Sequence, residues 1–338
     1  MIDKKFGYYT YNGLKTYNKL DIMTIAETAE GVQWHYNDEF FSVYDWTKEP
    51  KESLLELYKN RASELRNKYD YIILMLSGGS DSGNILESFV RNNIHLDEAV
   101  SIVNIEGSRD PHDYQNKEIV STAKPRIDRY IKEFKLKTIH RVIDNSIVVH
   151  KHFNDANKFD FINSVNNHGG PFTHAKNELS KQVPLWQNLV NSGKRVCFIW
   201  GVEKPFVSCK TNGSAFRDFR FYFNDIIDGS IGSAVSNPDG TFDGIINELF
   251  YWAPTEASAK ILIKQSHVIK NFISTTPFEK LKLLENKDDE IICKIIAHGY
   301  VITLGGSTLK LLIYPQFDPF EFLNGKSPTG NFISSRDL

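Results

Sequence analysis

The stretch that most constrains the fold is YDYIILMLSGGSDSGNILESFV, residues 69–90. Tyr71–Leu76 is a continuous apolar run, which is typical of a strand buried on both faces of a parallel sheet. From Ser82 onward, apolar residues recur at the spacing of a helix. The pattern therefore predicts a tight loop between a buried strand and a helix, made of Ser77, Gly78, Gly79, Ser80, Asp81 and Ser82.

A loop in this position is suited to bind phosphate. Its backbone N–H groups point toward one place, and the following helix adds the positive end of its dipole. Glycines allow a ligand to approach the backbone closely, and serine hydroxyls add donors. The charge of Asp81 would repel phosphate unless a divalent cation lay between them, which indicates a magnesium site. A plain turn or linker is the alternative interpretation of a Ser/Gly stretch.

Two common phosphate motifs are excluded. A Walker loop ends in Gly-Lys-Ser/Thr, and the only such triplet, Gly325-Lys326-Ser327, has Phe320 where the motif needs a glycine and is followed by Pro328. The loop also lacks the GxGxxG spacing of dinucleotide-binding folds.

SGGSDS matches SGGxDS, the signature of the N-type ATP pyrophosphatases, or PP-loop enzymes, and the resemblance covers about residues 69–200. The family includes asparagine synthetase, whose synthetase domain this region resembles, and NAD synthetase. The flanking thirds resemble uncharacterised asparagine-synthase-like proteins of tailed phages. The resemblance implies an adenine nucleotide alpha hydrolase-like fold and the cofactors ATP and Mg²⁺. It also implies a ligase that adenylates a carboxylate or amide oxygen, releases pyrophosphate and forms a C–N bond with ammonia or an amine.

The resemblance assigns roles to individual residues. The loop from Ser77 to Ser82 would hold the leaving pyrophosphate, and Asp81 would ligate Mg²⁺. Val103 and Asn104, at the end of the next predicted strand, would lie beside the adenine and ribose, because ligands bind at the carboxyl ends of parallel strands. Glu203 and Lys204 follow the buried run RVCFIW and would bind metal or substrate and phosphate; a salt bridge at the end of the strand is the alternative.

The rest of the chain predicts an α/β fold with a doubly wound parallel sheet. Further buried strands are predicted over 99–105, 138–149 and 195–200, with helices over 117–134 and 178–191, the latter disturbed by Pro184. Residues 1–48 form a predicted strand-rich N-terminal appendage with turns at Asn12-Gly13 and Asn37-Asp38. Residues 49–210 form the PP-loop domain, which begins with a helix opened by Pro50.

Residues 211–338 are predicted to form a mainly helical C-terminal cap. Helices are expected over 256–273, 278–284 and 288–298, and a hairpin over 301–314 around Gly305-Gly306. The aromatic residues Phe250, Tyr251 and Trp252 are expected in the core, although a pocket wall is an alternative.

Composition narrows the class of protein. The 338 residues carry a formal net charge of −2, so neither general nucleic-acid binding nor membrane binding is expected. No apolar run near the motif could span a bilayer, and the N-terminus lacks the apolar core of a signal peptide. The three cysteines, Cys197, Cys209 and Cys293, form no CxxC pair, which favours a reducing cytoplasm and argues against structural zinc. The expected partners are a small-molecule or nucleotide substrate and a second copy in a homodimer.

Several residues and functions stay open at this stage. Lys210, Arg217 and Arg220, like Arg109 in the loop after the second strand, could contact phosphate or be solvated surface charges. His150, His152, His168 and His174 lack the spacing of a metal site. No cysteine precedes Cys197, so an N-terminal-cysteine glutaminase is not expected. A non-catalytic ATP- or AMP-binding module, or a thiolase- or sulfonucleotide-reductase-like enzyme, is the alternative to a ligase.

Overall fold

The fold is known from a computed structural model. It describes residues 8–16, 19–26, 28, 30–104, 116, 118–148, 179–201, 205–212, 215–222, 241–242, 244–285, 291–296, 299–304 and 310–316. The predicted loop residues Glu203 and Lys204 lie outside these ranges. So do Ser108-Arg109-Asp110, the four histidines between 150 and 174, Gly305-Gly306 and Gly325-Lys326-Ser327.

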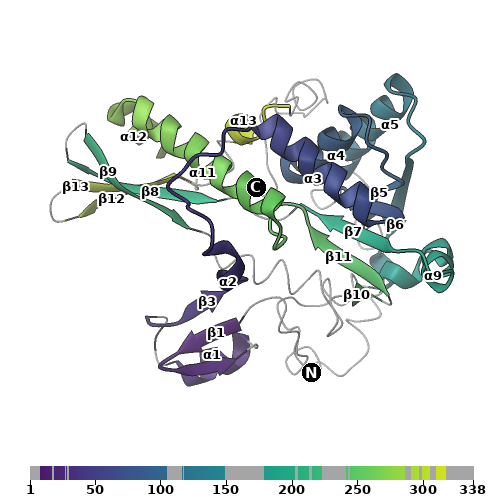
Figure 1. Cartoon of the computed structure of the whole chain (residues 1–338), viewed down its shortest axis with the longest axis horizontal. Coiled ribbons are helices and arrows are strands. Elements are labelled where there is room, and N and C mark those ends of the chain that lie inside the picture. The colour runs from purple at the N-terminus through teal and green to yellow at the C-terminus, as the bar shows by residue number, and fades with distance from the viewer. Residues whose placement is uncertain are drawn as a thin grey trace.

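The centre of the molecule is a six-stranded sheet with five parallel strands (Figure 1). Its spatial order is β10 (Thr241–Phe242), β11 (Ile245–Leu249), β7 (Val196–Trp200), β4 (Tyr71–Met75), β5 (Glu98–Val103) and β6 (Ile139–Asp144). Only β10 runs antiparallel to its neighbour. In chain order the parallel strands read 3-2-1-4-5 from β6 to β11, so the order reverses between β4 and β7. The predicted doubly wound α/β fold is confirmed, and this reversal is its topological switch point.

The two faces of the sheet are buried against different elements. On β4, Ile72 and Leu74 join a core that includes residues of α3 (Leu54–Lys68), α4 (Ser80–Val90), α5 (Lys124–Glu133) and α11 (Glu256–Thr275). Ile73 and Met75 point to the opposite face, where Trp186 of α9 (Pro184–Asn191) packs. Side chains alternate between faces along a strand, so the apolar run of β4 is buried on both sides, as its sequence predicts.

Two helix starts differ from the sequence-based expectation. The helix after Pro50 begins at Leu54, with Ser53 as its N-cap; the Ser53 side chain accepts from the Glu56 amide, and the Glu56 carboxylate accepts from the Ser53 amide. The capping box that begins at Ser53, three residues after Pro50, therefore determines where this helix starts. Pro184 does not disturb a helix but begins α9, because proline has no N–H to lose in the first turn. A short 3-10 turn, Leu179–Lys181, precedes it.

The N-terminal residues form an antiparallel sheet, as predicted. β1 (Tyr8–Tyr11) lies between β2 (Leu14–Thr16) and β3 (Gln33–His35), and Asn12 and Gly13 turn the first hairpin with φ angles of 47° and 81°. The segment also contains α1 (Lys19–Ile25) and α2 (Asp38–Phe41). Asn37-Asp38 is not a hairpin turn, since Asn37 is the N-cap residue of α2.

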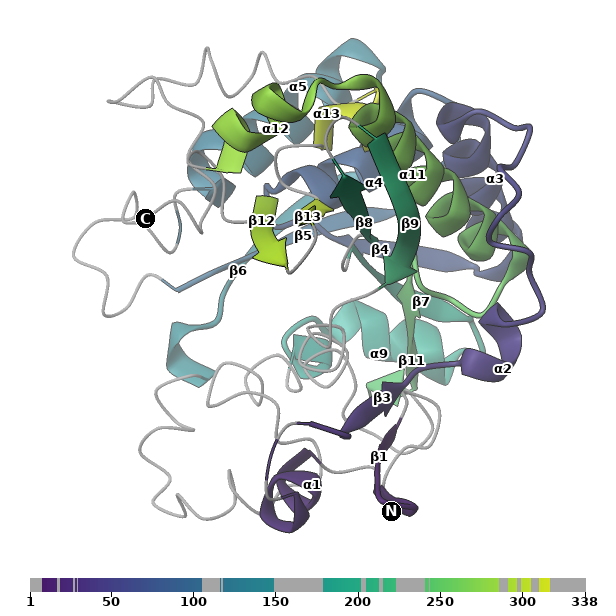
Figure 2. The ribbon, with the colours of Figure 1, turned by 90° about the vertical axis from the view of Figure 1, so that its left-hand side faces the viewer.

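The chain beyond residue 205 contains a second sheet of four antiparallel strands (Figure 2). Its order is β12 (Ile291–Ile296), β13 (Gly299–Leu304), β8 (Phe206–Asn212) and β9 (Ala215–Tyr222). The helix expected over 288–298 is wrong, because Ile291–Ile296 is a strand paired along its whole length with β13. β12 ends at Ile296 and pairs there with Gly299, the first residue of β13, so these two strands form a hairpin. The turn expected at Gly305-Gly306 lies outside the described residues. Two helices accompany this sheet, α12 (Phe278–Glu285) and α13 (Lys310–Ile313).

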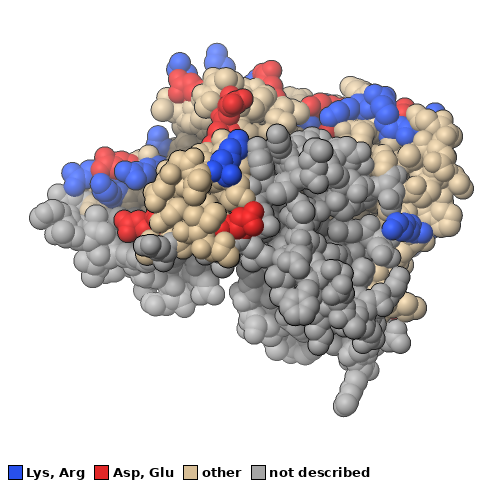
Figure 3. Space-filling model, turned by 90° about the horizontal axis from the view of Figure 1, so that it is seen from below, with Lys and Arg blue, Asp and Glu red and all other residues tan. Residues whose placement is uncertain are grey.

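β11, which lies beyond the predicted boundary at residue 210, also belongs to the parallel sheet, and this strand was not expected from the sequence. The boundaries at 48 and 210 stay predictions. No helix among the described residues is long and apolar enough to cross a membrane. On the face seen in Figure 3, the described Lys and Arg side chains lie interspersed with Asp and Glu.

Candidate functional site

The SGGSDS loop connects β4 to α4 at the switch point of the sheet. Leu76 continues the strand, and its amide donates to the Val100 carbonyl at 2.7 Å. Gly78 then adopts a φ of +94°, and α4 begins at Ser80 with Gly79 as N-cap. The predicted strand–loop–helix arrangement is confirmed, and the helix starts two residues earlier than its apolar periodicity indicates.

Serine hydroxyls hold the loop in shape. The Ser77 amide donates to Ser82 Oγ at 3.2 Å, and Ser82 Oγ donates to the Gly79 carbonyl at 3.2 Å. The Gly79 amide donates to Ser77 Oγ at 3.3 Å. The two hydroxyls are 3.1 Å apart. Ser77 and Ser82 thus stabilise the conformation of the loop through hydrogen bonds within it.

The first turn of α4 has donors that its own side chains do not satisfy. Gly79 supplies no side-chain cap, so the N-terminal amides of the helix have no capping partner from this residue. The Ser80 side chain is buried, with 3% of its surface exposed, and its hydroxyl has no hydrogen-bond partner among the described residues. Buried hydroxyls are usually hydrogen-bonded in folded proteins, which makes the Ser80 hydroxyl a candidate contact for a ligand.

Two neighbouring strand ends approach the same loop. A Cβ atom on Gly201, the residue after β7, would lie 3.1 Å from the Ser82 amide nitrogen and 3.2 Å from the carbonyl carbon of Asp81. Gly201, at the end of β7, therefore faces the first turn of α4. Val202, Glu203 and Lys204 themselves lie outside the described residues.

Near the end of β5, Glu118 contacts the loop, and the sequence did not reveal this contact. The Asn104 amide donates to Asn116 Oδ1 at 2.9 Å, and Asn116 Nδ2 donates to the Asn104 carbonyl at 3.0 Å. The chain then enters a π-helical turn, Ile119–Ala123, and Glu118 just before it lies against Gly78. Asn104 Oδ1 is a second buried side-chain atom with no partner among the described residues. Val103, in contrast, is 4% exposed and packs in the core.

Asp81 is held by two tyrosines from distant parts of the chain. The Tyr314 hydroxyl donates to Asp81 Oδ1 at 2.5 Å, and the Tyr251 hydroxyl donates to the Asp81 carbonyl at 3.0 Å. The Tyr251 hydroxyl also accepts from Asn84 Nδ2 at 3.0 Å. Burial, followed by the negative charge of Asp81, raises the pKa of Tyr314 well above its usual range, so this hydroxyl remains a donor at neutral pH.

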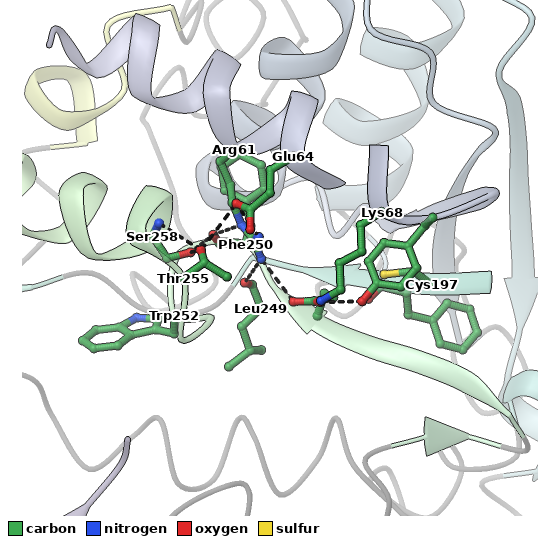
Figure 4. A network of polar contacts seen from close by, with 12 residues as sticks. Arg61, Glu64, Lys68, Cys197, Leu249, Phe250, Trp252, Thr255 and Ser258 are labelled. Atoms are coloured by element: carbon green, nitrogen blue, oxygen red, sulfur yellow. Dashed lines mark hydrogen bonds and ion pairs between the residues drawn. The ribbon is translucent and has the colours of Figure 1, made fainter. Parts of the chain in front are cut away.

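A buried ion network fixes the segment that carries Tyr251 (Figure 4). Arg61 donates from Nε to the Phe250 carbonyl and from NH2 to the Leu249 carbonyl, both at 3.1 Å. Its guanidinium also pairs with Glu248 at 3.1 Å and with Glu64 at 2.9 Å. Arg61 therefore satisfies the backbone carbonyls at the end of β11, where the chain turns toward Tyr251. The core position expected for Phe250, Tyr251 and Trp252 is confirmed, with at most 2% of each exposed.

The basic candidates of the second sheet are on exposed positions. Lys210 of β8 pairs with Asp218 at 3.6 Å, with both side chains about half exposed. Arg217 and Arg220 are exposed on β9, an edge strand of that sheet. The structure thus places these three on the antiparallel sheet and not at a strand end of the parallel sheet.

Comparison with known proteins gives only distant structural likeness. No protein-family model matches the chain, and no curated protein matches its sequence. An NH3-dependent NAD synthetase from Campylobacter jejuni is 15% identical over 73% of this chain and 86% of its own, with a TM-score of 0.31. An NAD+ synthetase from Burkholderia pseudomallei is 13% identical over 70% of this chain and 75% of its own, with a TM-score of 0.29. At these TM-scores the likeness decides neither family nor function, which must rest on the residues described above.

Proposed function

We propose that the protein is an ATP-dependent, AMP-forming ligase. In this proposal it adenylates a substrate carboxylate or amide oxygen, releases pyrophosphate and then forms a C–N bond with ammonia or an amine. The observation that carries the proposal is the start of α4. Its amides have no side-chain cap from Gly79, and the buried Ser80 hydroxyl has no partner within the described part of the chain, at the switch point where ligands of such sheets bind.

The carboxylate of Asp81 suits a magnesium ion that is also bound by the phosphate groups of ATP. Among the described residues, no group of three or more His, Cys, Asp and Glu side chains could hold a metal by itself. Mg²⁺ in nucleotide enzymes is commonly held by one or two carboxylates plus the phosphate oxygens of the substrate. Asp81 would supply the carboxylate, and the ion would neutralise charge on the leaving pyrophosphate.

The proposed roles of the other residues rest on their positions in the structure or, where the structure does not describe them, in the sequence. The backbone of Gly78, Gly79 and Ser80 would bind the pyrophosphate, while Ser77 and Ser82 keep the loop closed around it. Asn104 would lie nearest to the nucleoside, because it directly follows β5 and its side-chain oxygen has no partner in the ranges that the structure describes. For Glu203 and Lys204, which would complete the site from the loop after β7, the proposal rests on sequence position.

The test compares Asp81→Asn with a matched control, Asp128→Asn, whose carboxylate is about half exposed on α5. The protein is incubated with ATP, Mg²⁺ and a metabolite pool, pyrophosphate release is measured, and the adenylate is identified by mass spectrometry. Asp81→Asn should cost about 1 kcal/mol of stability or less, because an amide still accepts from Tyr314. Its rate should fall about 10²–10³-fold, the usual loss when electrostatic stabilisation is removed. Asp128→Asn should turn over like the wild type.

Two results would contradict the proposal. A normally folded Asp81→Asn variant with the wild-type rate would make Asp81 a helix-capping residue. ATP that binds without any release of pyrophosphate from the full metabolite pool would favour the non-catalytic nucleotide-binding module.

A further inference from the structure

Residues 310–316 pack against α3, α4 and α11, and Tyr314 and Gln316 contact α4, more than 220 residues away in sequence. Gln316 Nε2 donates to the Asn84 carbonyl and Asn84 Oδ1, both at 3.0 Å, and is 2.9 Å from Ser88 Oγ. Tyr314, two residues earlier, reaches the first turn of the helix at Asp81. The segment thus lies along α4 from the phosphate-binding end to its third turn.

Stacked rings fix the position of Tyr314. Its ring lies 5.9 Å from that of Tyr251 with an interplanar angle of 29°, and 6.2 Å from that of Tyr58 on α3. The Tyr58 hydroxyl donates to the Ile313 carbonyl and accepts from Gln265 of α11 at 2.9 Å. Figure 1 shows α13 beside α3 and α11, in agreement with these contacts. All three tyrosines are fully buried, so the Tyr314 hydroxyl has little freedom to point elsewhere.

The hydroxyl of Tyr314 has one proton, and it is directed at Oδ1 of Asp81. A carboxylate on a helix turn can otherwise adopt several rotamers, while a hydrogen bond from a buried, rigid donor selects one of them. The Asp81 backbone is fixed as well, because its carbonyl accepts from Tyr251. A carboxylate held in one orientation loses less conformational freedom when it binds a cation.

We infer that Tyr314 is a positioning residue that orients Asp81 for cation binding, so that docking of residues 310–316 is coupled to binding of Mg·ATP. The inference rests on the proposed function, since it concerns the same carboxylate. Because coupling is reciprocal, Mg·ATP should in turn stabilise the docked segment.

The test measures ATP affinity by isothermal titration calorimetry, with Mg²⁺ and with EDTA. Tyr314→Phe keeps the ring and deletes the hydroxyl. It should weaken ATP binding about tenfold with Mg²⁺, as expected for losing a hydrogen bond to a charged group, and leave affinity in EDTA unchanged. Tyr36→Phe is the matched control, because its buried hydroxyl donates to the Trp252 carbonyl and does not touch Asp81. It should bind ATP like the wild type in both conditions.

A double-mutant cycle distinguishes orientation of Asp81 by Tyr314 from a general loss of packing around Tyr314. Asp81→Asn should abolish the gain in affinity from Mg²⁺, and adding Tyr314→Phe in that background should change nothing further, since the two residues act as one unit. Each variant is accompanied by a thermal melt. If Tyr314→Phe melts below the assay temperature, Gln316→Ala loosens the same segment without touching the hydroxyl and should weaken Mg²⁺-dependent affinity in the same sense.

The outcomes distinguish the inference from the proposed function. Wild-type Mg²⁺ dependence in Tyr314→Phe, beside its loss in Asp81→Asn, would overturn the inference and leave the proposed function standing. Equal weakening with Mg²⁺ and with EDTA would show a purely structural role and would also overturn it. A wild-type protein whose ATP binding does not respond to Mg²⁺ would overturn both.

Discussion

Gly78 in the loop and Glu118 before the π-helical turn are in such close contact that no side chain fits between them. A Cβ atom on Gly78 would lie 2.4 Å from the Glu118 carbonyl oxygen and 2.8 Å from its carbonyl carbon. Gly78 also has a φ of +94°, a conformation that residues with a Cβ rarely adopt. The loop therefore depends on glycine at this position for its shape.

We expect Gly78→Ala to destabilise the protein by about 2 kcal/mol or more. The positive φ alone costs roughly 1–2 kcal/mol for a residue with a Cβ, and the backbone contact with Glu118 adds to this. Urea denaturation measures the change in the free energy of unfolding.

Gly79→Ala is the control for this prediction. Gly79 has a φ of −67°, and the nearest atom to an added Cβ is Ser77 Oγ at 3.5 Å. Alanine is a poorer N-cap than glycine, so a loss within about 1 kcal/mol is expected. If both variants were equally stable, the contact between Gly78 and Glu118 would not constrain the loop.

The strands β4 and β7 could be predicted because each is a continuous apolar run, and β5 could be predicted because only Ser101 interrupts the apolar residues from Ala99 to Val103. β11 could not, because Asn247 and Glu248 interrupt its apolar pattern. The structure satisfies both polar groups from other elements: Trp200 Nε1 donates to Asn247 Oδ1 at 2.8 Å, and Arg61 pairs with Glu248. A buried strand with polar residues is recognisable only when the partners of those residues are known.

The residues of the candidate site also fall into two groups, those that the sequence identifies and those that only the structure reveals. The loop from Ser77 to Ser82 is contiguous in sequence, so its strand and helix neighbours identify it. Tyr251, Tyr314 and Glu118 reach it through tertiary contacts, and Tyr314 is 233 residues away from Asp81. No local periodicity or turn signal reports such a contact, so these residues could not be found without the structure.

The second prediction concerns the buried carboxylate of Glu248. Besides Arg61, it accepts from Lys68 Nζ and from the Tyr69 hydroxyl, both at 2.5 Å. Glu248→Gln removes the charge that compensates the fully buried Arg61 guanidinium. We expect a loss of about 3 kcal/mol at pH 7, at the low end for a broken buried pair because Glu64 still contacts Arg61. Glu279→Gln, at an exposed position of α12, should leave the urea midpoint unchanged.

The third prediction is the pH dependence of this difference. Burial by itself would raise the pKa of Glu248, but Arg61, Lys68 and the Tyr69 hydroxyl together lower it below its ordinary value of 4.5. A carboxylate whose pKa is lower in the folded state stabilises the fold above its unfolded-state pKa, and this contribution is lost as the pH falls. The gap in stability between wild type and Glu248→Gln should therefore be full at pH 7 and narrow below about pH 4.5. Thermal melts from pH 7 to pH 3 measure it; a gap that stayed constant would mean that Glu248 does not titrate in this range.

The last prediction concerns Cys197 and Cys209, the two cysteines whose side chains the structure describes, which are at most 1% exposed. Burial, followed by the charge of Glu248, raises the pKa of the Cys197 thiol well above its usual range, so thiolate is scarce at neutral pH. Alkylating reagents attack thiolates that they can reach. In the native protein at pH 8, both cysteines should therefore remain unmodified by iodoacetamide, while both should react in urea, as peptide mass spectrometry would show. Rapid labelling of native Cys197 or Cys209 would contradict their burial. It would also favour the thiolase-like alternative, because that chemistry needs a cysteine sulfur that the substrate can reach.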